Sequence, residues 1–387
     1  TPLFIACLLY QPLSNAAPSS PPRDTQPDTP QNRPLPPRPE PDNLPENIDQ
    51  LALQALGQQI FFDSNLSNPA GQSCASCHLP EAGFADPDQT IATSEGAVTG
   101  IFGKRNSPTI SYSQFIPPFQ VNNNQRGGRA RGGLFIDGRA DSLEEQAKAP
   151  FLSPLEMNNN NAEAVIARID SAAYAAQFKA LFGEQSLLDS DTAFDQVALA
   201  LAAFERSPQV SPFNAKFDAI IQGDDTPSDA EIRGFQLFTG QAGCVRCHSN
   251  NNGAEQVFSN FSYENIGVPA NPDNPFYAMD PAFNPQGTGF IDLGLGAVTG
   301  EPRHNGQFRI PTLRNISLTA PYMHNGVFNT LEEVINFYNT RDLNPEQFPA
   351  EVNANVSRRG GIGNLGLSDS EVQDLIAFLN ALSDRPQ

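Results

Sequence analysis

Apolar side chains recur at helical spacing along much of the 387-residue chain. Residues 48–60 and 191–206 each place them on one face, which predicts two amphipathic helices. A third periodic pattern begins after Asn161, a good helix-capping residue, and continues to Gly183, a common stop. We therefore expect one continuous helix between this cap and this glycine.

Three capping boxes predict further helices in the second half of the chain. Each has Ser or Thr followed three residues later by Glu, at 228–231, 330–333 and 368–371. No run of residues alternates between apolar and polar as strands would, and the remaining segments are rich in Gly, Pro and Asn. The pattern predicts an all-α protein with long loops.

The first 45 residues differ from the rest in composition. Residues 1–17 carry an apolar stretch and the small-residue pattern Ser14-Asn15-Ala16, which is typical of the end of a secretory signal peptide. We expect cleavage after Ala16 and a periplasmic protein; a lipid anchor at Cys7 is the less favoured alternative. Residues 18–45 hold eleven prolines among polar residues, which predicts a disordered linker. No later stretch is apolar enough to span a membrane.

After residue 17 the chain has four cysteines, and all of them fall in two CxxCH motifs. These are CASCH at 74–78 and CVRCH at 244–248. The spacing is the attachment signature of c-type haem. Cys74 and Cys77, like Cys244 and Cys247, would form thioethers to haem. His78 and His248 would each bind an iron from the proximal side.

Other chemistries use the same cysteines. One zinc ion could be held by four thiolates, or the pairs could be disulfides or redox-active CxxC motifs. None of these explains the two adjacent histidines. The supply of sixth ligands is small, because only His304, His324 and three methionines remain, besides tyrosine and lysine. A peroxide-reactive haem leaves one axial position open, whereas an electron-transfer haem has both filled.

The order of amphipathic helix, CxxCH, loops and further helices occurs twice. We expect an N-terminal haem domain over 46–222 and a C-terminal haem domain over 223–387, each all-α and cytochrome c-like. The net charge of −20 argues against nucleic-acid binding.

Three further stretches resemble the bacterial dihaem cytochrome c peroxidases and their relative MauG. They are KRNSPT (104–109), FIDGRADSLEEQAKAPFLSPLEM (135–157) and FRIPTLRNISLTAPYMHNG (308–326). The resemblance implies two haem domains, a peroxide-reactive N-terminal haem, an electron-transferring C-terminal haem and a calcium ion between them. By the same resemblance Asn106, through its side chain, and Thr319 and Pro321, through their carbonyls, hold the calcium. Asn106 is equally typical of an ordinary turn.

The resemblance also assigns the distal pocket of the first haem. Gln146 and, ten residues later, Glu156 match the family's pocket glutamine and glutamate. A carboxylate in a desolvated pocket can take a proton from bound peroxide and return it to the leaving oxygen. Gln146 would orient the peroxide. Without the resemblance, Glu156 is interpreted as a helix-end residue bonded to backbone, with Pro150 and Pro154 making a turn.

At the second haem the family position of the sixth ligand lies fourteen residues after His324, where Tyr338 stands. Ordinary peroxidases have methionine here and MauG has tyrosine, so the resemblance implies an iron held by His248 and Tyr338. A phenolate is a hard ligand that favours Fe(III). Spacing alone makes Tyr338 a core residue on an apolar helical face. Met323 is a rival ligand, but it matches no ligand position.

Two features depart from the family pattern. Residues 79–103 contain no histidine that could close the first iron. Ile136 stands where the family has a tryptophan between the haems. Outside the motifs, His304 is expected at the surface more than at a haem propionate. Arg126, Arg129, Arg131 and Arg139 concentrate positive charge that would balance haem propionates or dock a partner. For the first three, a solvated glycine-rich loop is an equal alternative.

The sequence therefore predicts a periplasmic dihaem enzyme that uses hydrogen peroxide and oxidises a protein or redox partner, as MauG-like members do. An ordinary peroxidase that takes electrons from a small cytochrome or cupredoxin is the alternative. A third hypothesis is that the protein is a non-catalytic electron carrier. The sequence names neither the electron donor nor the protein substrate, and it allows a monomer or a homodimer.

Overall fold

The structure is a computed structural model that describes residues 48–122, 129–249 and 256–386. Residues 1–47, including the expected signal segment, Cys7 and the proline-rich linker, lie outside the described residues, as does Arg126. Within the described ranges, no helix has the length and apolar character needed to cross a membrane.

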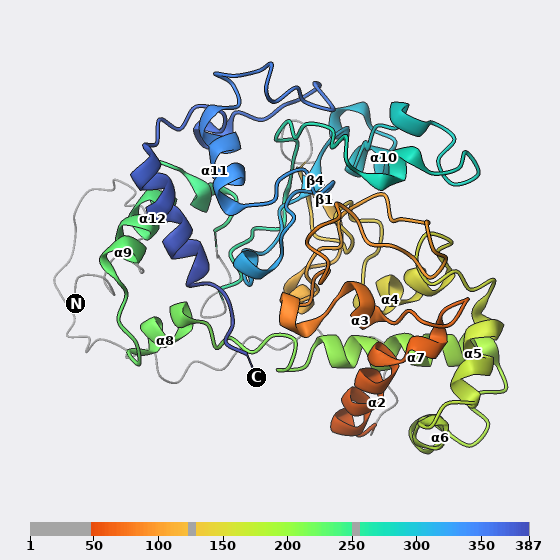
Figure 1. Ribbon diagram of the computed structural model, residues 1–387. Helices are drawn as coiled ribbons and strands as arrows, with labels where there is room; N and C mark the ends of the chain where they lie inside the picture. Colours follow the sequence, from red (N-terminus) through yellow and green to blue (C-terminus); the bar gives the residue numbers. More distant parts are fainter. Residues whose placement is uncertain (1–47, 123–128, 250–255, 387) are drawn as a thin grey trace. The chain divides into compact units, whose positions relative to one another are not determined.

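The first half of the chain is built around one long helix. Helix α7 (Ser190–Glu205) packs against α2 (Gln50–Phe62), α4 (Leu143–Leu152) and α5 (Ala162–Asp170) (Figure 1). Short helices α3 (Cys74–Cys77) and α6 (Ala175–Phe182) contact α2. The apolar faces expected over 48–60 and 191–206 are those that α2 and α7 bury against each other.

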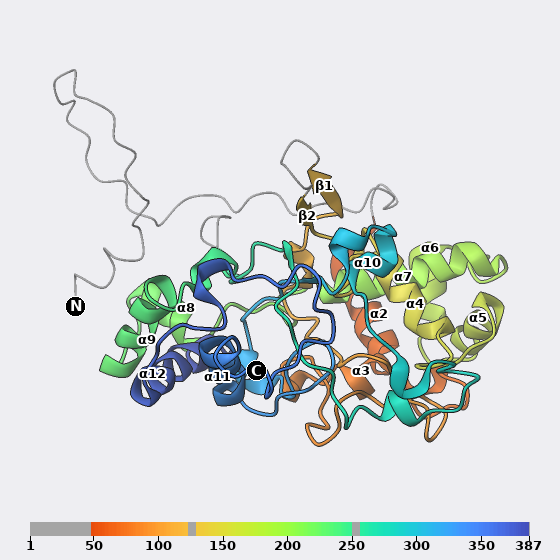
Figure 2. The same cartoon turned by 90° about the horizontal axis from the view of Figure 1, so that it is seen from above.

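The second half repeats this arrangement with other helices. Helix α9 (Asp229–Thr239) packs against α12 (Asp369–Asn380), which also contacts α11 (Leu331–Thr340) (Figure 2). All three begin at the expected capping boxes. Two shorter helices, α8 (Lys216–Gln222) and α10 (Leu295–Thr299), complete the set described here.

The two helix pairs meet at glycines in the same way. A Cβ on Gly57 of α2 would collide with the backbone of Ala200 in α7, and one on Gly234 of α9 would collide with the backbone of Asp374 in α12. Aromatic rings fill the space beside each contact. The ring centroids of Phe61 and Phe204 are 5.1 Å apart, as are those of Phe238 and Phe378. Truncating such a buried phenylalanine to alanine typically costs about 3–5 kcal/mol.

The strands are few and very short. Strand β1 (Gln120–Asn122) pairs antiparallel with β2 (Arg129–Arg131), and β3 (Tyr263–Glu264) pairs antiparallel with β4 (Phe308–Arg309). The described chain is therefore helix-rich, as expected, with long connecting loops.

Two details differ from the sequence prediction. The single helix expected from Asn161 to Gly183 is two helices, α5 and α6, separated by residues 171–174. The Ser171 hydroxyl donates back to the Ala167 carbonyl, a bond that favours a helix end, while the Tyr174 hydroxyl donates to Asp63 at 2.7 Å. In addition α4 was not predicted, because Pro150 suggested a turn; it lies in the last turn of the helix.

Candidate haem sites

The first CxxCH motif folds as one helical turn. Helix α3 begins after Ser73, whose backbone N–H donates to the Ser76 hydroxyl at 3.0 Å, and the turn closes with the His78 N–H donating to the Cys74 carbonyl. Residues three apart on a helix share a face, so Cys74 and Cys77 lie together beside the histidine. The second motif forms a similar turn over Cys244–Arg246.

The cysteines are free thiols, which fits thioether formation and not the disulfide alternative. The zinc alternative also fails. In the ranges that the structure describes, no three His, Cys, Asp or Glu side chains gather to hold a metal ion, so the two pairs do not build a shared site.

Both histidines are held for metal ligation in the same manner. Nδ1 of His78 donates to the Phe84 carbonyl at 3.2 Å, and Nδ1 of His248 donates to the Phe258 carbonyl at 2.9 Å. This bond fixes the tautomer whose Nε2 carries the free lone pair, the usual support of a metal-bound histidine. Burial lowers the pKa of each ring to about 4, so each is neutral and able to bind iron. The residues present therefore fit haem.

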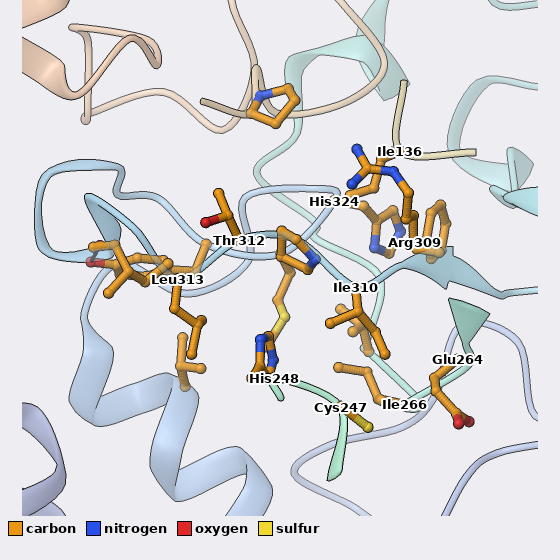
Figure 3. Close-up of a pocket in the computed structure, with 18 of the residues that line it drawn as sticks. Ile136, Cys247, His248, Glu264, Ile266, Arg309, Ile310, Thr312, Leu313 and His324 are labelled. Carbon is orange, nitrogen blue, oxygen red and sulfur yellow. Dashed lines mark hydrogen bonds between the residues drawn. The ribbon is translucent and has the colours of Figure 1, made fainter. Parts of the chain in front are cut away.

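A large apolar cavity adjoins the second motif. Cys244, Cys247 and His248 line it, and Figure 3 shows Cys247 and His248 beside Ile266 and Ile310. Tyr338, on α11, lines the same cavity. Burial raises the pKa of the Tyr338 phenol, and the two cysteines add to the rise, which places the phenol near the haem-attachment motif. Met323 also lines the cavity.

Glu156 lies near the first motif, in the turn that follows α4. Its N–H donates to the Ser153 carbonyl, and its own carbonyl accepts from the Ala97 N–H at 2.7 Å. Burial raises the pKa of the Glu156 carboxyl. Burial also raises the pKa of Cys74 and Cys77 to about 12, and the Glu156 carboxylate contributes to the rise at both thiols. Gln146 is half-buried on α4, one of the elements that packs on α7.

The three residues expected to hold calcium line the same cavity as His248. Asn106, Thr319 and Pro321 all contribute to its wall. The Asn106 side-chain amide contacts the Pro321 carbonyl oxygen, and the Asn106 N–H donates to the His324 carbonyl at 2.9 Å. With the Asn106 amide turned over, its oxygen would lie beside the Pro321 carbonyl oxygen, and two such oxygens suit a calcium ion.

A buried charged network near Ile136 was not predicted. Arg105 pairs with Asp292 through two bonds of 2.6 and 2.8 Å and with Asp137 at 2.6 Å. Burial alone would raise the pKa of Asp292, but Arg105 holds it well below its usual range. Arg309 donates its N–H to the Ile136 carbonyl at 2.8 Å, and Figure 3 draws both beside His324. Local sequence patterns give no sign of such long-range pairs.

The remaining histidines are both buried. His324 stacks on Phe308 with ring centroids 3.8 Å apart, and its Nε2 lies 3.5 Å from the Glu351 carboxylate. His304 is 3% exposed, with Nδ1 3.0 Å from the Thr299 hydroxyl, so the expected surface position is wrong. The Pro302–His304 turn folds the ring back onto α10, which a sequence pattern does not reveal.

The predicted arginines fall into two groups. Arg129 and Arg131 are exposed on β2, in agreement with a solvated segment, although Arg131 donates to the Asn260 carbonyl. Arg139 pairs with Asp137 at 2.8 Å and lies over the Phe135 ring, 3.4 Å from its centroid.

Glu205 is a buried carboxyl that sequence analysis also missed. It ends α7, is 6% exposed and lies near enough to Cys74 to raise the pKa of that thiol. Burial raises the pKa of Glu205 to about 8, because Arg206 beside it is bonded to Glu144 at 2.6 Å and offsets little of the cost. A glutamate at the end of an apolar helical pattern carries no local signal of burial.

Two histidines oriented for iron, each after a cysteine pair, define a c-type haem oxidoreductase. A sequence model of the family described as di-haem cytochrome c peroxidase matches residues 52–226. The chain is 39% identical over 356 residues to the methylamine utilization protein MauG of Paracoccus denitrificans, covering 86% of this chain and 89% of that one. It is 32% identical to the cytochrome-c peroxidase IdrP1 of Pseudomonas sp. strain SCT, covering 90% and 85%. The chain belongs to the dihaem cytochrome c peroxidase family.

Solved structures agree with this assignment. The dihaem peroxidase BthA of Burkholderia thailandensis E264 matches with a TM-score of 0.74 at 31% identity, covering 87% of each chain. A MauG-like protein associated with microbial copper homeostasis matches with a TM-score of 0.67 at 31% identity, covering 90% and 95%. The chain is therefore an oxidoreductase of this family, which agrees with the enzyme predicted from the sequence and not with a non-catalytic carrier.

Proposed function

We propose that the chain uses hydrogen peroxide at a haem on Cys74, Cys77 and His78, in the N-terminal haem domain (46–222). Haem iron, when bound, supplies the electron exchange with peroxide. The observation that supports this site best is the buried Glu156 carboxyl, whose charge acts on both Cys74 and Cys77. The deprotonated Glu156 carboxylate takes the proton from the peroxide oxygen nearer the haem and returns it to the other oxygen, which leaves as water. Gln146 orients the peroxide.

The C-terminal haem domain (223–387) stores or relays the oxidising equivalents. His248 would hold this iron through Nε2, and the Tyr338 phenol would supply the second protein ligand. Support comes from the cavity that both residues line and from the effect of Cys244 and Cys247 on the pKa of Tyr338. A hard oxygen ligand favours the ferric state and makes reduction by an ordinary cytochrome unfavourable.

The preferred activity is therefore MauG-like oxidation of a protein or redox partner in the periplasm. The similarity to MauG at 39% identity supports it, as does the absence of histidine from residues 79–103. The ordinary cytochrome c peroxidase reaction is the alternative, supported by the 32% identity to IdrP1 over a similar length. A monomer and a homodimer are both compatible with this proposal.

Adding peroxide to the fully ferric holoprotein separates the two activities. If the MauG-like proposal holds, the haem absorption bands change at once, without prior reduction, and the change reverses when a reductant is added. An ordinary peroxidase requires reduction of its second haem first. A ferric protein that is inert, but that turns over peroxide after one-electron reduction, would reject the MauG-like activity in favour of the alternative.

We also propose that Asn106, Thr319 and Pro321 hold a calcium ion between the haem sites. Side-chain and backbone oxygens suit this hard cation. Dialysis of the holoprotein against a calcium chelator should lower its melting temperature and change the haem spectra, and added calcium should restore both. Asn106→Ala should behave like the chelated protein. A chelated wild type that keeps its spectra and melting temperature, with no bound calcium by elemental analysis, would reject the site.

A further inference from the structure

Tyr112 is a buried tyrosine with a carboxylate at its hydroxyl. The side chain is 1% exposed, and its hydroxyl lies 2.8 Å from both carboxylate oxygens of Asp384. The phenol oxygen also accepts the Phe213 N–H at 3.0 Å. A phenol in this position has one donor bond, and that bond leads directly to a group that can take its proton.

Tyr112 belongs to a segment that contacts both haem sites. Thr109 and Ser111 donate their hydroxyls to the Gly83 carbonyl, and the Ile110 N–H donates to the Phe84 carbonyl, which also accepts from His78. On its other side Tyr112 lines the cavity that contains Cys244, Cys247 and His248. The tyrosine therefore lies on the chain segment that connects the proximal side of one haem with the cavity of the other.

The surroundings of the ring favour a neutral species. The Phe213 ring packs edge-on at 4.7 Å, and the Arg314 guanidinium lies 5.4 Å from the Tyr112 ring centroid. Arg314 is fully buried and bonded to Asp218 at 2.6 and 2.7 Å. A positive charge in a dry site disfavours a second one on the ring, so loss of an electron from Tyr112 requires loss of its proton.

Asp384 is suited to receive and release that proton. Burial raises the pKa of its carboxyl, which makes it a stronger base than an exposed aspartate. It is only half-buried, and it precedes the exposed Arg385, so the proton can pass on to solvent. The Asp384 N–H donates to the Asn315 side chain at 2.8 Å, which holds the carboxylate in place.

We propose that Tyr112 is a one-electron relay of the peroxide reaction and that Asp384 is its proton acceptor. This inference rests on the proposed function. Hydrogen peroxide becomes two water molecules by taking two electrons and two protons. Tyr112 would supply one of these electrons, the bound haems would supply the other, and both protons would come from solvent. The O–H bond of Tyr112 breaks as an O–H bond forms on Asp384, leaving a neutral tyrosyl radical. One electron from the protein partner and a proton returned by Asp384 then restore the phenol, and a second electron from the partner replaces the one that the haems supplied.

Two other buried tyrosines serve as comparisons. Tyr263 donates to the Gly132 carbonyl at 2.7 Å, and a carbonyl cannot keep a proton at neutral pH. Tyr174 donates to Asp63 at 2.7 Å, but it lies at the start of α6 and does not line the cavity of the second motif. Tyr263→Phe shows whether losing any buried phenol hydroxyl changes the result. Tyr174→Phe shows whether losing a different tyrosine–aspartate bond does so.

The experiment mixes ferric holoprotein with hydrogen peroxide, freezes it within milliseconds, and records EPR and optical spectra of the same samples. Wild type should give a tyrosyl radical signal. Tyr112→Phe and Asp384→Asn should each reduce it by about 10²-fold or more, the lower end expected for loss of a group in a proton-transfer step. Both variants should keep the haem response to peroxide, although Tyr112→Phe should melt at a lower temperature because the Phe213 N–H loses its acceptor. Tyr263→Phe and Tyr174→Phe should keep the radical.

A radical that persists in Tyr112→Phe, or haem spectra that respond in wild type without any tyrosyl radical, would overturn the relay and leave the proposed function standing. Haem spectra that do not respond in the ferric protein, and still do not respond after one-electron reduction, would overturn the proposed function. In that case flash-generated ruthenium(III) tris(bipyridine) serves as the oxidant. The Tyr112 radical yield should then fall in Asp384→Asn, and equal yields in wild type and variant would refute the pair.

Discussion

The two haem sites are alike on the proximal side and different on the other. In both, a histidine follows a cysteine pair and donates Nδ1 to the backbone carbonyl of a phenylalanine, Phe84 or Phe258. In both, the preceding helix meets its partner at a glycine. The remaining surroundings differ: a buried glutamate, Glu156, lies near the first motif, and a tyrosine, Tyr338, near the second.

This difference indicates that the side chains opposite the histidines determine what each site does. The CxxCH motif predicts that haem is attached and that the adjacent histidine binds its iron. The motif does not determine whether the sixth coordination position of the iron is open to peroxide or filled by a protein ligand. In the proposal, a carboxyl that can move protons makes the first site reactive, and a phenol that can bind iron makes the second an electron store. Changing one side chain at each site should therefore separate the two roles.

The largest effect is expected at Glu156. Glu156→Gln keeps the shape of the side chain but removes the base, and the rate of the peroxide reaction should fall by about 10²–10⁴-fold, as measured by stopped-flow absorption. The wild-type rate should rise with pH through the pKa of Glu156, because only the deprotonated carboxylate accepts a proton. Burial raises that pKa, so the rise should occur above the range of an ordinary glutamate.

Glu163→Gln, at an exposed position in the first turn of α5, is the matched control and should leave rate and pH profile unchanged. A Glu156→Gln variant that kept the wild-type rate would remove the chemical distinction between the two sites.

The next effect is expected at Tyr338. Tyr338→Phe should remove the oxygen ligand from the second iron, so that its low-spin ferric EPR signal is lost. Its reduction potential should rise by on the order of 0.1 V, a fraction of the range that axial ligands cover. Tyr322→Phe is the control, because Tyr322 lines the same cavity but donates its hydroxyl to the Ile316 carbonyl. If Tyr338→Phe retained both signal and potential, Met323 would become the candidate ligand.

A smaller effect, on stability, is expected at Glu205. The stretches Ala203-Phe204-Glu205 and Ala377-Phe378-Leu379 match each other, so the first site has a carboxyl where the second has leucine. Burial raises the pKa of Glu205 from 4.5 to about 8. Between these values the unfolded chain releases a proton that the folded chain keeps, so stability is lost as pH rises through this window.

Glu205→Gln does not titrate and should lose less stability over that range. The difference from wild type should grow by up to about 4 kcal/mol between about pH 5 and pH 8, at about 1.4 kcal/mol per pH unit, seen as a widening gap in melting temperature. Glu163→Gln should show no such widening. Parallel pH profiles for wild type and Glu205→Gln would mean that the carboxyl is not held protonated in the folded protein.

The sequence predicted the parts of the fold that local patterns control. The capping boxes at 228–231, 330–333 and 368–371 each begin a helix, because a cap satisfies backbone groups within a few residues. Predictions failed where local signals conflicted. Pro150 was interpreted as a turn residue, so α4 was not predicted. The apolar periodicity after Asn161 predicted one continuous helix and gave no sign of the break at 171–174.

The candidate site shows the same limit. Haem attachment was predicted from the motifs, and the roles of Glu156, Gln146 and Tyr338 were predicted from the family resemblance. The bonds of Arg105 with Asp137 and Asp292, the burial of Glu205 and the contact of Tyr112 with Asp384 join residues far apart in sequence. No periodicity or spacing encodes such pairs, because tertiary packing alone brings them together.

The short segment 106–112 restricts the insertions and deletions that this protein can accept during evolution. Asn106 contacts the Pro321 carbonyl, Ile110 bonds to Phe84, and Tyr112 lines the cavity of the second motif. Each contact depends on the register of the same seven residues. Loops usually accept insertions and deletions, but here a single one would misalign contacts at both metal centres together. We expect this stretch to vary in side chains and not in length.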